Sequence, residues 1–245
     1  MIYLFDLDGT LSEARKPVSH SFDHFLCDWL ETHDAYIVTA SDFPKLQEQC
    51  STHLLDNMNG SFTCMGNELW KGDNNVYHND IDWNPSLYTR LEDLWRSSQY
   101  SSKFGNHIEL RSGLINFSTV GRNANATQRN EYTKWDNINK ERQNIVDALT
   151  DEFPMYDFLI GGRISIDIVP TTASKVLAVK WLRDNDITED IAFFGDNCQP
   201  GGNDYDIAEM LKMESNSNIV YEVAGPHDTQ TILTRYIHKQ VAANN

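Results

Sequence analysis

Two aspartates, Asp6 and Asp8, stand two positions apart in the segment DLDGT at positions 6–10. The apolar run before them, residues 2–5, is typical of a buried strand, and open α/β sheets bind their ligands where such strands end. Side chains two positions apart in extended chain point to the same side, so both carboxylates can face one phosphoryl group. Mg²⁺ prefers carboxylate, water and phosphate oxygens. The segment therefore predicts a magnesium-dependent phosphoryl-transfer site rather than a solvated turn.

A second acidic loop, GDNCQPGGND at positions 195–204, also follows an apolar run, residues 191–194. An acidic loop repels phosphate unless it holds a cation, so we expect a metal here. Asp196 is the predicted ligand, and Asp204 is either a further ligand or a residue that orients one. An ordinary turn with a helix cap is the alternative. We assign no role to Cys198, because acidic neighbours raise the pKa of a thiol.

Arginine is grouped in the middle of this acidic chain. Arg111, Arg122 and Arg129 fall within 19 residues that contain no Asp or Glu. A guanidinium group forms paired hydrogen bonds with phosphate oxygens, so the three residues predict an anion-binding cluster. Solvated surface arginines are the alternative interpretation.

Polar residues near position 170 are candidates for sugar contacts. Alternation in residues 163–169 places Ser165 and Asp167 on one face of a predicted strand and three isoleucines on the other. The two side chains suit hydrogen bonds to a polyol, and a structural polar pair between strands is the alternative. Lys175 begins a predicted helix, where it either neutralises a phosphorylated aspartate or lies at the surface.

The elements that position these residues follow two patterns. Apolar strands alternate with amphipathic helices at both ends of the chain, which predicts an α/β fold with a parallel sheet covered on both faces. The middle contains two hairpins and a long helix, capped at Asn125 through its spacing to Gln128, which predicts an α+β unit with an antiparallel sheet. We expect residues 1–79 and 173–245 to form a catalytic core, and residues 80–172 an inserted cap domain. The expected strands are 2–5, 36–38, 191–194 and 219–221, the hairpins span 107–120 and 157–169, and the helices include 22–30, 42–54, 174–184, 204–212 and one with Ile138, Ile145, Leu149 and Phe153 on one face.

The composition argues against several classes of function. The 36 acidic and 20 basic side chains give a net charge of −16, which disfavours binding to nucleic acid and to anionic membranes. No apolar run approaches the roughly 18 residues that a membrane span needs, and no basic leader precedes the first strand. We therefore expect a cytoplasmic protein. The cysteines lack the CxxC spacing of zinc sites and are too scattered for a disulfide framework: Cys27, Cys50, Cys64 and Cys198.

Together these residues resemble the haloacid dehalogenase (HAD) superfamily, whose members carry a DxDGT segment, a Ser or Thr, a Lys and a Gly-Asp acidic segment in this order. Within that superfamily the chain is similar to the eukaryotic-type phosphomannomutases, in the predicted core and in the cap. Either Thr39 or Ser41 could supply the hydroxyl group of the Ser or Thr motif. The similar stretches are residues 6–15, 41–49, 108–122, 128–131, 160–167 and 193–206.

The resemblance implies an HAD-like Rossmannoid core and a role for each matching residue. Asp6 would be the nucleophile that becomes aspartyl phosphate, and Asp8 the general acid/base, with its backbone carbonyl on Mg²⁺. Asp6 and Asp196 would supply carboxylates to the metal, with Asp204 nearby, and Lys175 would be the motif lysine. The sugar-phosphate contacts would come from Arg15, Arg111, Arg122, Arg129, Ser165 and Asp167.

The reaction that the resemblance implies is the interconversion of mannose 6-phosphate and mannose 1-phosphate for GDP-mannose synthesis. A hexose 1,6-bisphosphate would prime the enzyme, and relatives imply a homodimer joined through the cap. A sugar-phosphate phosphatase of the HAD type and an inactive sugar-phosphate sensor are the competing interpretations. The chain departs from the family at residues 64–66 (CMG), where relatives have Glu-Asn-Gly, and at Asn197, where lysine is usual. These departures concern the cap hinge, the dimer contacts and the mutase-to-phosphatase ratio.

Overall fold

The computed structural model describes the backbone of residues 1–243 and the side chains of residues 1–235. This part of the chain forms two compact units. Unit 1 consists of Met1–Asn79 and the chain from Ser174 onward, and unit 2 consists of Asp80–Ala173. None of the described helices combines the length and the apolar character that crossing a bilayer requires.

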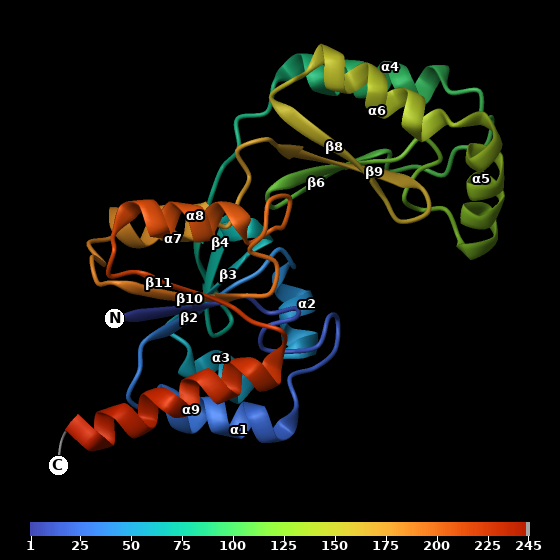
Figure 1. Cartoon of the computed structure of the whole chain (residues 1–245). Helices are drawn as coiled ribbons and strands as arrows, with labels where there is room; N and C mark the ends of the chain where they lie inside the picture. The colour runs from blue at the N-terminus through green and yellow to red at the C-terminus, as the bar shows by residue number, and fades with distance from the viewer. Residues whose placement is uncertain (244–245) are drawn as a thin grey trace. The chain divides into compact units, whose positions relative to one another are not determined.

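Unit 1 is built on a mixed, mostly parallel sheet (Figure 1). Its central strands are apolar throughout because both faces of the sheet are buried, which confirms the predicted α/β class. Three strands were not predicted: the parallel β3 (Gly60–Thr63), and β4 (Glu68–Lys71) and β5 (Asn74–His78), which extend one edge in antiparallel pairing. The parallel strands, in order across the sheet, are β11 (Ile219–Glu222), β10 (Ile191–Gly195), β1 (Ile2–Phe5), β2 (Ala35–Val38) and β3 (Gly60–Thr63).

Helices cover both faces of this sheet (Figure 1). Neighbouring side chains of a strand point to opposite faces, so Tyr3 and Phe5 pack into one apolar cluster and Leu4 into another. Each large apolar side chain buried in this way contributes about 1.5–3 kcal/mol. Tyr3 and Phe5 share their cluster with α1 (His20–Leu30), α2 (Phe43–Gln49), α3 (Thr52–Asn57) and α9 (Pro226–Ala243), and Leu4 shares its cluster with α7 (Val176–Asp184) and α8 (Tyr205–Glu214).

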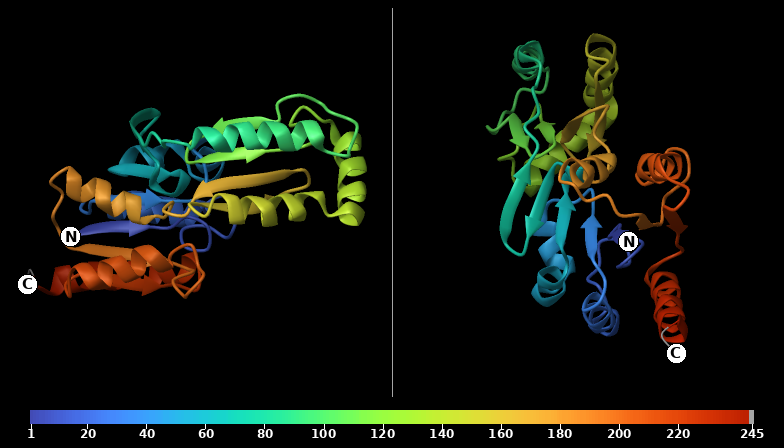
Figure 2. Two further views of the ribbon diagram at one scale, coloured as in Figure 1. Left: turned by 90° about the horizontal axis from the view of Figure 1, so that it is seen from above. Right: turned by 90° about the vertical axis from the view of Figure 1, so that its left-hand side faces the viewer.

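Unit 2 is the predicted antiparallel α+β unit. Its helices α4 (Pro85–Ser97) and α6 (Glu141–Glu152) pack on one face of the sheet, where Leu91, Phe117 and Leu149 are buried together. α5 (Ala126–Asn139) lies crosswise to both helices at one end of the unit (Figure 2). The sheet order is β6 (Ile108–Arg111), β7 (Leu114–Phe117), β9 (Ser165–Pro170) and β8 (Tyr156–Gly161).

The helix predicted over residues 42–54 is divided into α2 and α3. Cys50 is extended, with φ −111° and ψ 144°, and it ends α2. The Ser51 hydroxyl then accepts a hydrogen bond from the backbone N–H of Leu54 and caps α3. The prediction of one helix was wrong because the apolar period continues across the break.

The long helix predicted after Asn125 is likewise two helices, α5 and α6. Its capping box is present, with Asn125 and Gln128 each accepting from the other's backbone N–H. Lys140 takes a left-handed conformation, with φ 56°, and separates the two helices. The expected common face was therefore wrong, because Ile138 is 81% exposed whereas Ile145 is buried.

Candidate active site

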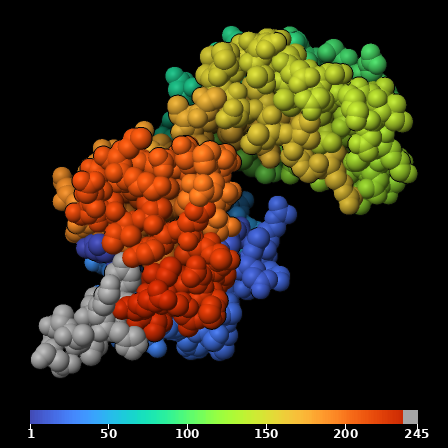
Figure 3. Space-filling view, viewed as in Figure 1, coloured from blue at the N-terminus to red at the C-terminus, as the bar shows by residue number. Residues whose placement is uncertain are grey.

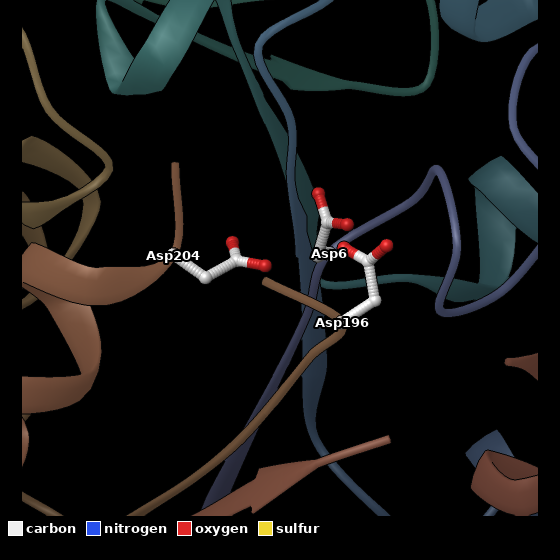
Figure 4. Close-up of side chains that lie close together, drawn as sticks. All are labelled: Asp6, Asp196 and Asp204. Atoms are coloured by element: carbon white, nitrogen blue, oxygen red, sulfur yellow. The ribbon is translucent and has the colours of Figure 1, made fainter. Parts of the chain in front are cut away.

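Three carboxylates gather at the carboxyl end of the unit 1 sheet. Asp6 and Asp196 follow β1 and β10, which are neighbouring parallel strands, and Asp204 is the N-cap residue of α8. One oxygen from each carboxylate lies within 4.8 Å of the other two, and Figure 4 shows the side chains converging from three separate segments. Carboxylate oxygens are the ligands that Mg²⁺ prefers, so this donor set fits the predicted metal.

Two glycines make this gathering possible. Gly9 has φ 83°, and a Cβ atom at that position would lie 2.1 Å from Oδ2 of Asp196. A Cβ atom at Gly195 would lie 2.6 Å from Oδ2 of Asp204. Any side chain at either position would displace a carboxylate, so the glycines of the two acidic segments are required for close approach.

Lys175 lies beside the nucleophile candidate, in contact with two of these carboxylates. Its Nζ donates to Oδ1 of Asp6 and, at 2.7 Å, to Oδ1 of Asp204. The lysine is fully buried at the start of α7, which excludes the alternative of a surface lysine. A buried ammonium group with two carboxylate partners is satisfied, and it holds Asp6 in one orientation.

The electrostatics of the site favour a cation. Burial raises the pKa of Asp6 to about 6, with the charge of Lys175 lowering it and that of Asp204 raising it. Burial also raises the pKa of Asp196, and the charge of Asp204 adds to this. Burial lowers the pKa of Lys175, but the charges of Asp6 and Asp204 outweigh it and leave that pKa above its usual value. Three carboxylates and one ammonium group leave excess negative charge, which a divalent cation would compensate.

Asp8 is held differently from Asp6. Its Oδ1 accepts from the backbone N–H of Arg15 at 2.5 Å and from Nε2 of Gln49 at 2.9 Å. Among the described residues, the candidate metal-binding group does not include the Asp8 carboxylate, and the expected contact of the metal with the Asp8 backbone carbonyl stays a prediction. Gln49 was not predicted as a site residue, because a glutamine at the end of a helix carries no local signal of function.

The two candidates for the motif hydroxyl both follow β2, the neighbour of β1. Thr39 is buried, and its hydroxyl accepts a hydrogen bond from the backbone N–H of Ser41 at 3.1 Å. The choice between them stays a prediction.

The arginines of unit 2 form a linked group. Arg111 donates to Glu109 at 2.7 Å, and Nε of Arg122 lies 3.2 Å from the same carboxylate oxygen. Arg129 is half-buried and donates to two backbone carbonyls, those of Arg122 and Ala124, both at 2.7 Å. Arg129 therefore holds the turn that carries Arg122. Glu109 was not predicted as part of this group, because it lies just before residues 111–129, the stretch without Asp or Glu.

The remaining candidates are distributed over both units. Asp167 accepts from Nδ2 of Asn116, which lies directly opposite it in the β7–β9 pair, so the structural polar pair does form. The hydroxyl of Ser165 donates to the carbonyl of Gly161 at 3.2 Å. Arg15 is exposed in a loop of unit 1, whereas the other three arginines belong to unit 2.

The fold has counterparts among solved structures. A haloacid dehalogenase-like hydrolase from Bacteroides thetaiotaomicron superposes with a TM-score of 0.60 at 13% sequence identity, over 96% of this chain and 98% of that chain. A trehalose-6-phosphate phosphatase related protein superposes with a TM-score of 0.55 at 15% identity, over the full length of both chains. At these identities the likeness establishes the fold.

The sequence has closer relatives. The phosphomannomutase of Saccharomyces cerevisiae is 34% identical over 243 residues, which cover 95% of this chain and 92% of the relative. The phosphomannomutase of Spinacia oleracea is 31% identical over 237 residues, covering 94% and 92%. The profile of the family described as eukaryotic phosphomannomutase matches residues 22–239. The chain therefore belongs to the eukaryotic phosphomannomutase family.

Proposed function

We propose that the chain interconverts mannose 6-phosphate and mannose 1-phosphate through an aspartyl phosphate on Asp6, and so supplies GDP-mannose synthesis. The family supports the reaction. The observation that carries the mechanism is the buried contact between Lys175 and Asp6, because it orients a carboxylate nucleophile and provides a cation beside the phosphate it would carry.

Asp6, Asp196 and the backbone carbonyl of Asp8 would hold Mg²⁺, with Asp204 as a further ligand or as the residue that fixes Lys175. When bound, the metal supplies positive charge that stabilises the transferring phosphoryl group. Lys175 adds a second positive charge on the side of Asp6 and Asp204.

The chemical step follows from the two carboxylates of DLDGT. A carboxylate oxygen of Asp6 attacks the phosphorus atom, and the bond between phosphorus and the sugar oxygen breaks. The electron pair of that bond stays on the sugar oxygen, which takes a proton from Asp8. In the reverse direction, the free hydroxyl of a bound hexose monophosphate gives its proton to Asp8 and attacks the aspartyl phosphate, and the bond between Asp6 and phosphorus breaks, which leaves a hexose bisphosphate and a free Asp6 carboxylate. Attack of Asp6 on the phosphate at the other end of this bisphosphate then releases the isomerised monophosphate. A hexose 1,6-bisphosphate supplies the first phosphoryl group to Asp6.

Unit 2 supplies the contacts for the rest of the substrate in this proposal. A mutase binds a phosphate at either end of the sugar, so it needs an anion site away from the nucleophile. Arg111, Arg122 and Arg129, together with Arg15, are the residues proposed for it. Ser165 and Asp167 are proposed to bind sugar hydroxyls. We further propose a cytoplasmic homodimer joined through residues 80–172, the inserted cap domain, without nucleic-acid or membrane partners.

The proposed reaction is tested by supplying mannose 1-phosphate and Mg²⁺, with and without glucose 1,6-bisphosphate, and measuring mannose 6-phosphate and free phosphate separately. We expect mannose 6-phosphate to dominate and to depend on the bisphosphate, and EDTA to abolish turnover. Asp6→Asn should be inactive, and Asp28→Asn, an exposed position on α1, should behave as wild type. Free phosphate as the main product, with or without bisphosphate, would instead identify a phosphatase.

A further inference from the structure

Gln49 lies at the end of α2 and holds the segment that follows the nucleophile. Its Nε2 lies 2.9 Å from Oδ1 of Asp8, 3.3 Å from the hydroxyl of Ser12 and 3.2 Å from the carbonyl of Lys16. Its own backbone carbonyl accepts from the N–H of Val18 at 2.8 Å. Gln49 therefore contacts the segment near both of its ends, although it is 41 positions away from Asp8 in the chain.

The segment needs such an anchor because most of it is exposed. Residues 13–17 lie at the surface of unit 1, where the loop is blue in Figure 3. Gln49 itself is only 3% exposed and sits at the base of this loop. The contacts to Asp8 thus come from a residue fixed in the core rather than from the loop alone.

These contacts distinguish the two oxygens of the Asp8 carboxyl group. Both hydrogen bonds to this side chain, from Gln49 Nε2 and from the Arg15 backbone, end on Oδ1. Within residues 1–235, no hydrogen bond reaches Oδ2. Both N–H groups thus occupy Oδ1, and Oδ2 is the oxygen of Asp8 that is left available to a substrate.

The other end of the Gln49 amide indicates why a glutamine occupies this position. Its Oε1 is buried and has no hydrogen-bond partner among the described residues. An unpaired buried carbonyl costs about 1–3 kcal/mol, which an apolar side chain would avoid. Reversing the amide would place Oε1 against Oδ1 of Asp8 and the carbonyl of Lys16, both of which are acceptors. The N–H donors of the amide, rather than its oxygen, therefore explain why a glutamine occupies position 49.

We propose that Gln49 is a positioning residue for Asp8, which it holds with Oδ2 free to deliver a proton to the sugar oxygen. The inference rests on the proposed phosphoryl transfer. When Asp6 attacks phosphorus, the bond between phosphorus and the sugar oxygen breaks, and the sugar oxygen keeps the electron pair and takes the proton from Oδ2. The N–H groups of Gln49 and Arg15 then stabilise the carboxylate that remains on Asp8.

The test compares two phosphate donors that differ in their need for this proton. Cleavage of glucose 1,6-bisphosphate releases a sugar oxygen that must be protonated, whereas p-nitrophenyl phosphate releases a stable phenolate. Both donate to Asp6, and each is followed in a single turnover with enzyme in excess. The variant is Gln49→Met, which keeps the length of the side chain and removes its N–H donors. Gln47→Met, an exposed position on the same helix, is the matched control.

We expect the ratio of the two rates, bisphosphate over p-nitrophenyl phosphate, to fall about 10- to 100-fold in Gln49→Met, because general acid catalysis contributes about 10²–10⁴-fold. The ratio should stay unchanged in Gln47→Met. Both rates are measured on one preparation of each variant. A smaller fraction of folded enzyme lowers both rates equally and so does not change their ratio. Gln49→Leu removes the same donors and should lower the ratio as well.

Equal losses for both donors, which leave the ratio unchanged, would assign Gln49 a merely structural role and overturn the inference, as would wild-type rates with both donors. A wild-type enzyme that takes phosphate from neither donor would contradict the proposed function instead, since the ratio then has no reaction to report on.

Discussion

Lys175 and Asp204 form an ion pair in which Nζ lies 2.7 Å from Oδ1 and neither side chain reaches solvent. The same Nζ also donates to Asp6, so one lysine joins the first acidic segment to the second. Three segments that are far apart in the sequence are thereby held at one point. The stability of this arrangement and the chemistry of the site are consequently linked.

Removing the ammonium group in Lys175→Met should destabilise the metal-free protein by about 3–5 kcal/mol, because buried carboxylates lose their partner. Mg²⁺ should restore part of this loss by supplying positive charge to the same carboxylates. Thermal melting in EDTA and in Mg²⁺ measures both effects. Lys180→Met, an exposed position on α7, is the control, and equal melting temperatures for the two variants would contradict the expectation.

Arg129→Lys should raise KM for mannose 1-phosphate about tenfold, which corresponds to about 1.4 kcal/mol. Lysine cannot reproduce the planar fork that binds the carbonyls of Arg122 and Ala124, so the turn carrying Arg122 should loosen. Steady-state kinetics provide the measurement. Arg163→Lys is the control, because the Arg163 side chain is exposed and, among the described residues, donates one hydrogen bond, to Asn130. A KM that rises equally in both variants would argue against a positioning role.

Two ion pairs of unit 2 should differ sharply in their contribution to stability. Arg142 donates to Asp136 at 2.8 Å, and both side chains are nearly buried. Its Nη1 also lies 3.2 Å from the carbonyl of Gly162, in the turn before Ser165. Because a buried charge would be left unpaired, Arg142→Met should cost about 3–5 kcal/mol.

The comparison for this pair is Arg90→Met. Arg90 donates to both carboxylate oxygens of Glu152, but the pair is exposed, so its loss should cost at most about 1 kcal/mol. Urea unfolding followed by tryptophan fluorescence measures both variants. Similar costs would show that burial does not decide the contribution of these pairs.

The Cys64 thiol should react slowly at neutral pH. Burial raises its pKa to about 12, and the negative charges of Glu68 and Asp42 add to the shift. Only the thiolate is a nucleophile, so alkylation by iodoacetamide should keep rising about tenfold per pH unit past pH 9 instead of levelling there. Glu68→Gln should lower the pKa and so accelerate the reaction at a fixed pH below it. Peptide mass spectrometry measures the extent of alkylation at Cys64. Glu92→Gln, a change at an exposed position of unit 2, is the control and should have no effect.

Cys64 also begins the segment 64–66, where a departure from the family is expected. It belongs to the short 3₁₀ helix η1 (Cys64–Gly66), in which Cys64 and Met65 both have positive φ, at 51° and 59°. Non-glycine residues take this conformation at a cost of about 1–2 kcal/mol each, so the turn is held by its surroundings. A Cβ atom at Gly66 would lie 2.9 Å from the backbone nitrogen of Ala178, so this position requires glycine.

Much of the fold could be predicted because its signals are local. The strands before Asp6 and before Asp196 are short apolar runs, and the box of Asn125 and Gln128 needs only a spacing of three residues. The divisions of the helices at Cys50 and Lys140 could not be predicted, since one or two residues with non-helical backbone do not disturb the apolar period. β3, β4 and β5 were missed because β5 is mostly exposed and polar, and because β3 (GSFT) and β4 (ELWK), although largely buried, contain no apolar run.

By itself, the sequence determined the two acidic segments, the acid-free group of arginines and the α/β class, because residue type and spacing along the chain carry that information. Only the tertiary structure decided that Lys175 is buried against Asp6, 169 positions away, and that Gln49 ends on Oδ1 of Asp8. It also decided that Arg129 holds the backbone of its neighbours. Contacts of this kind depend on which strands lie side by side and on the direction in which each side chain leaves them, and neither is written in the local pattern of residues.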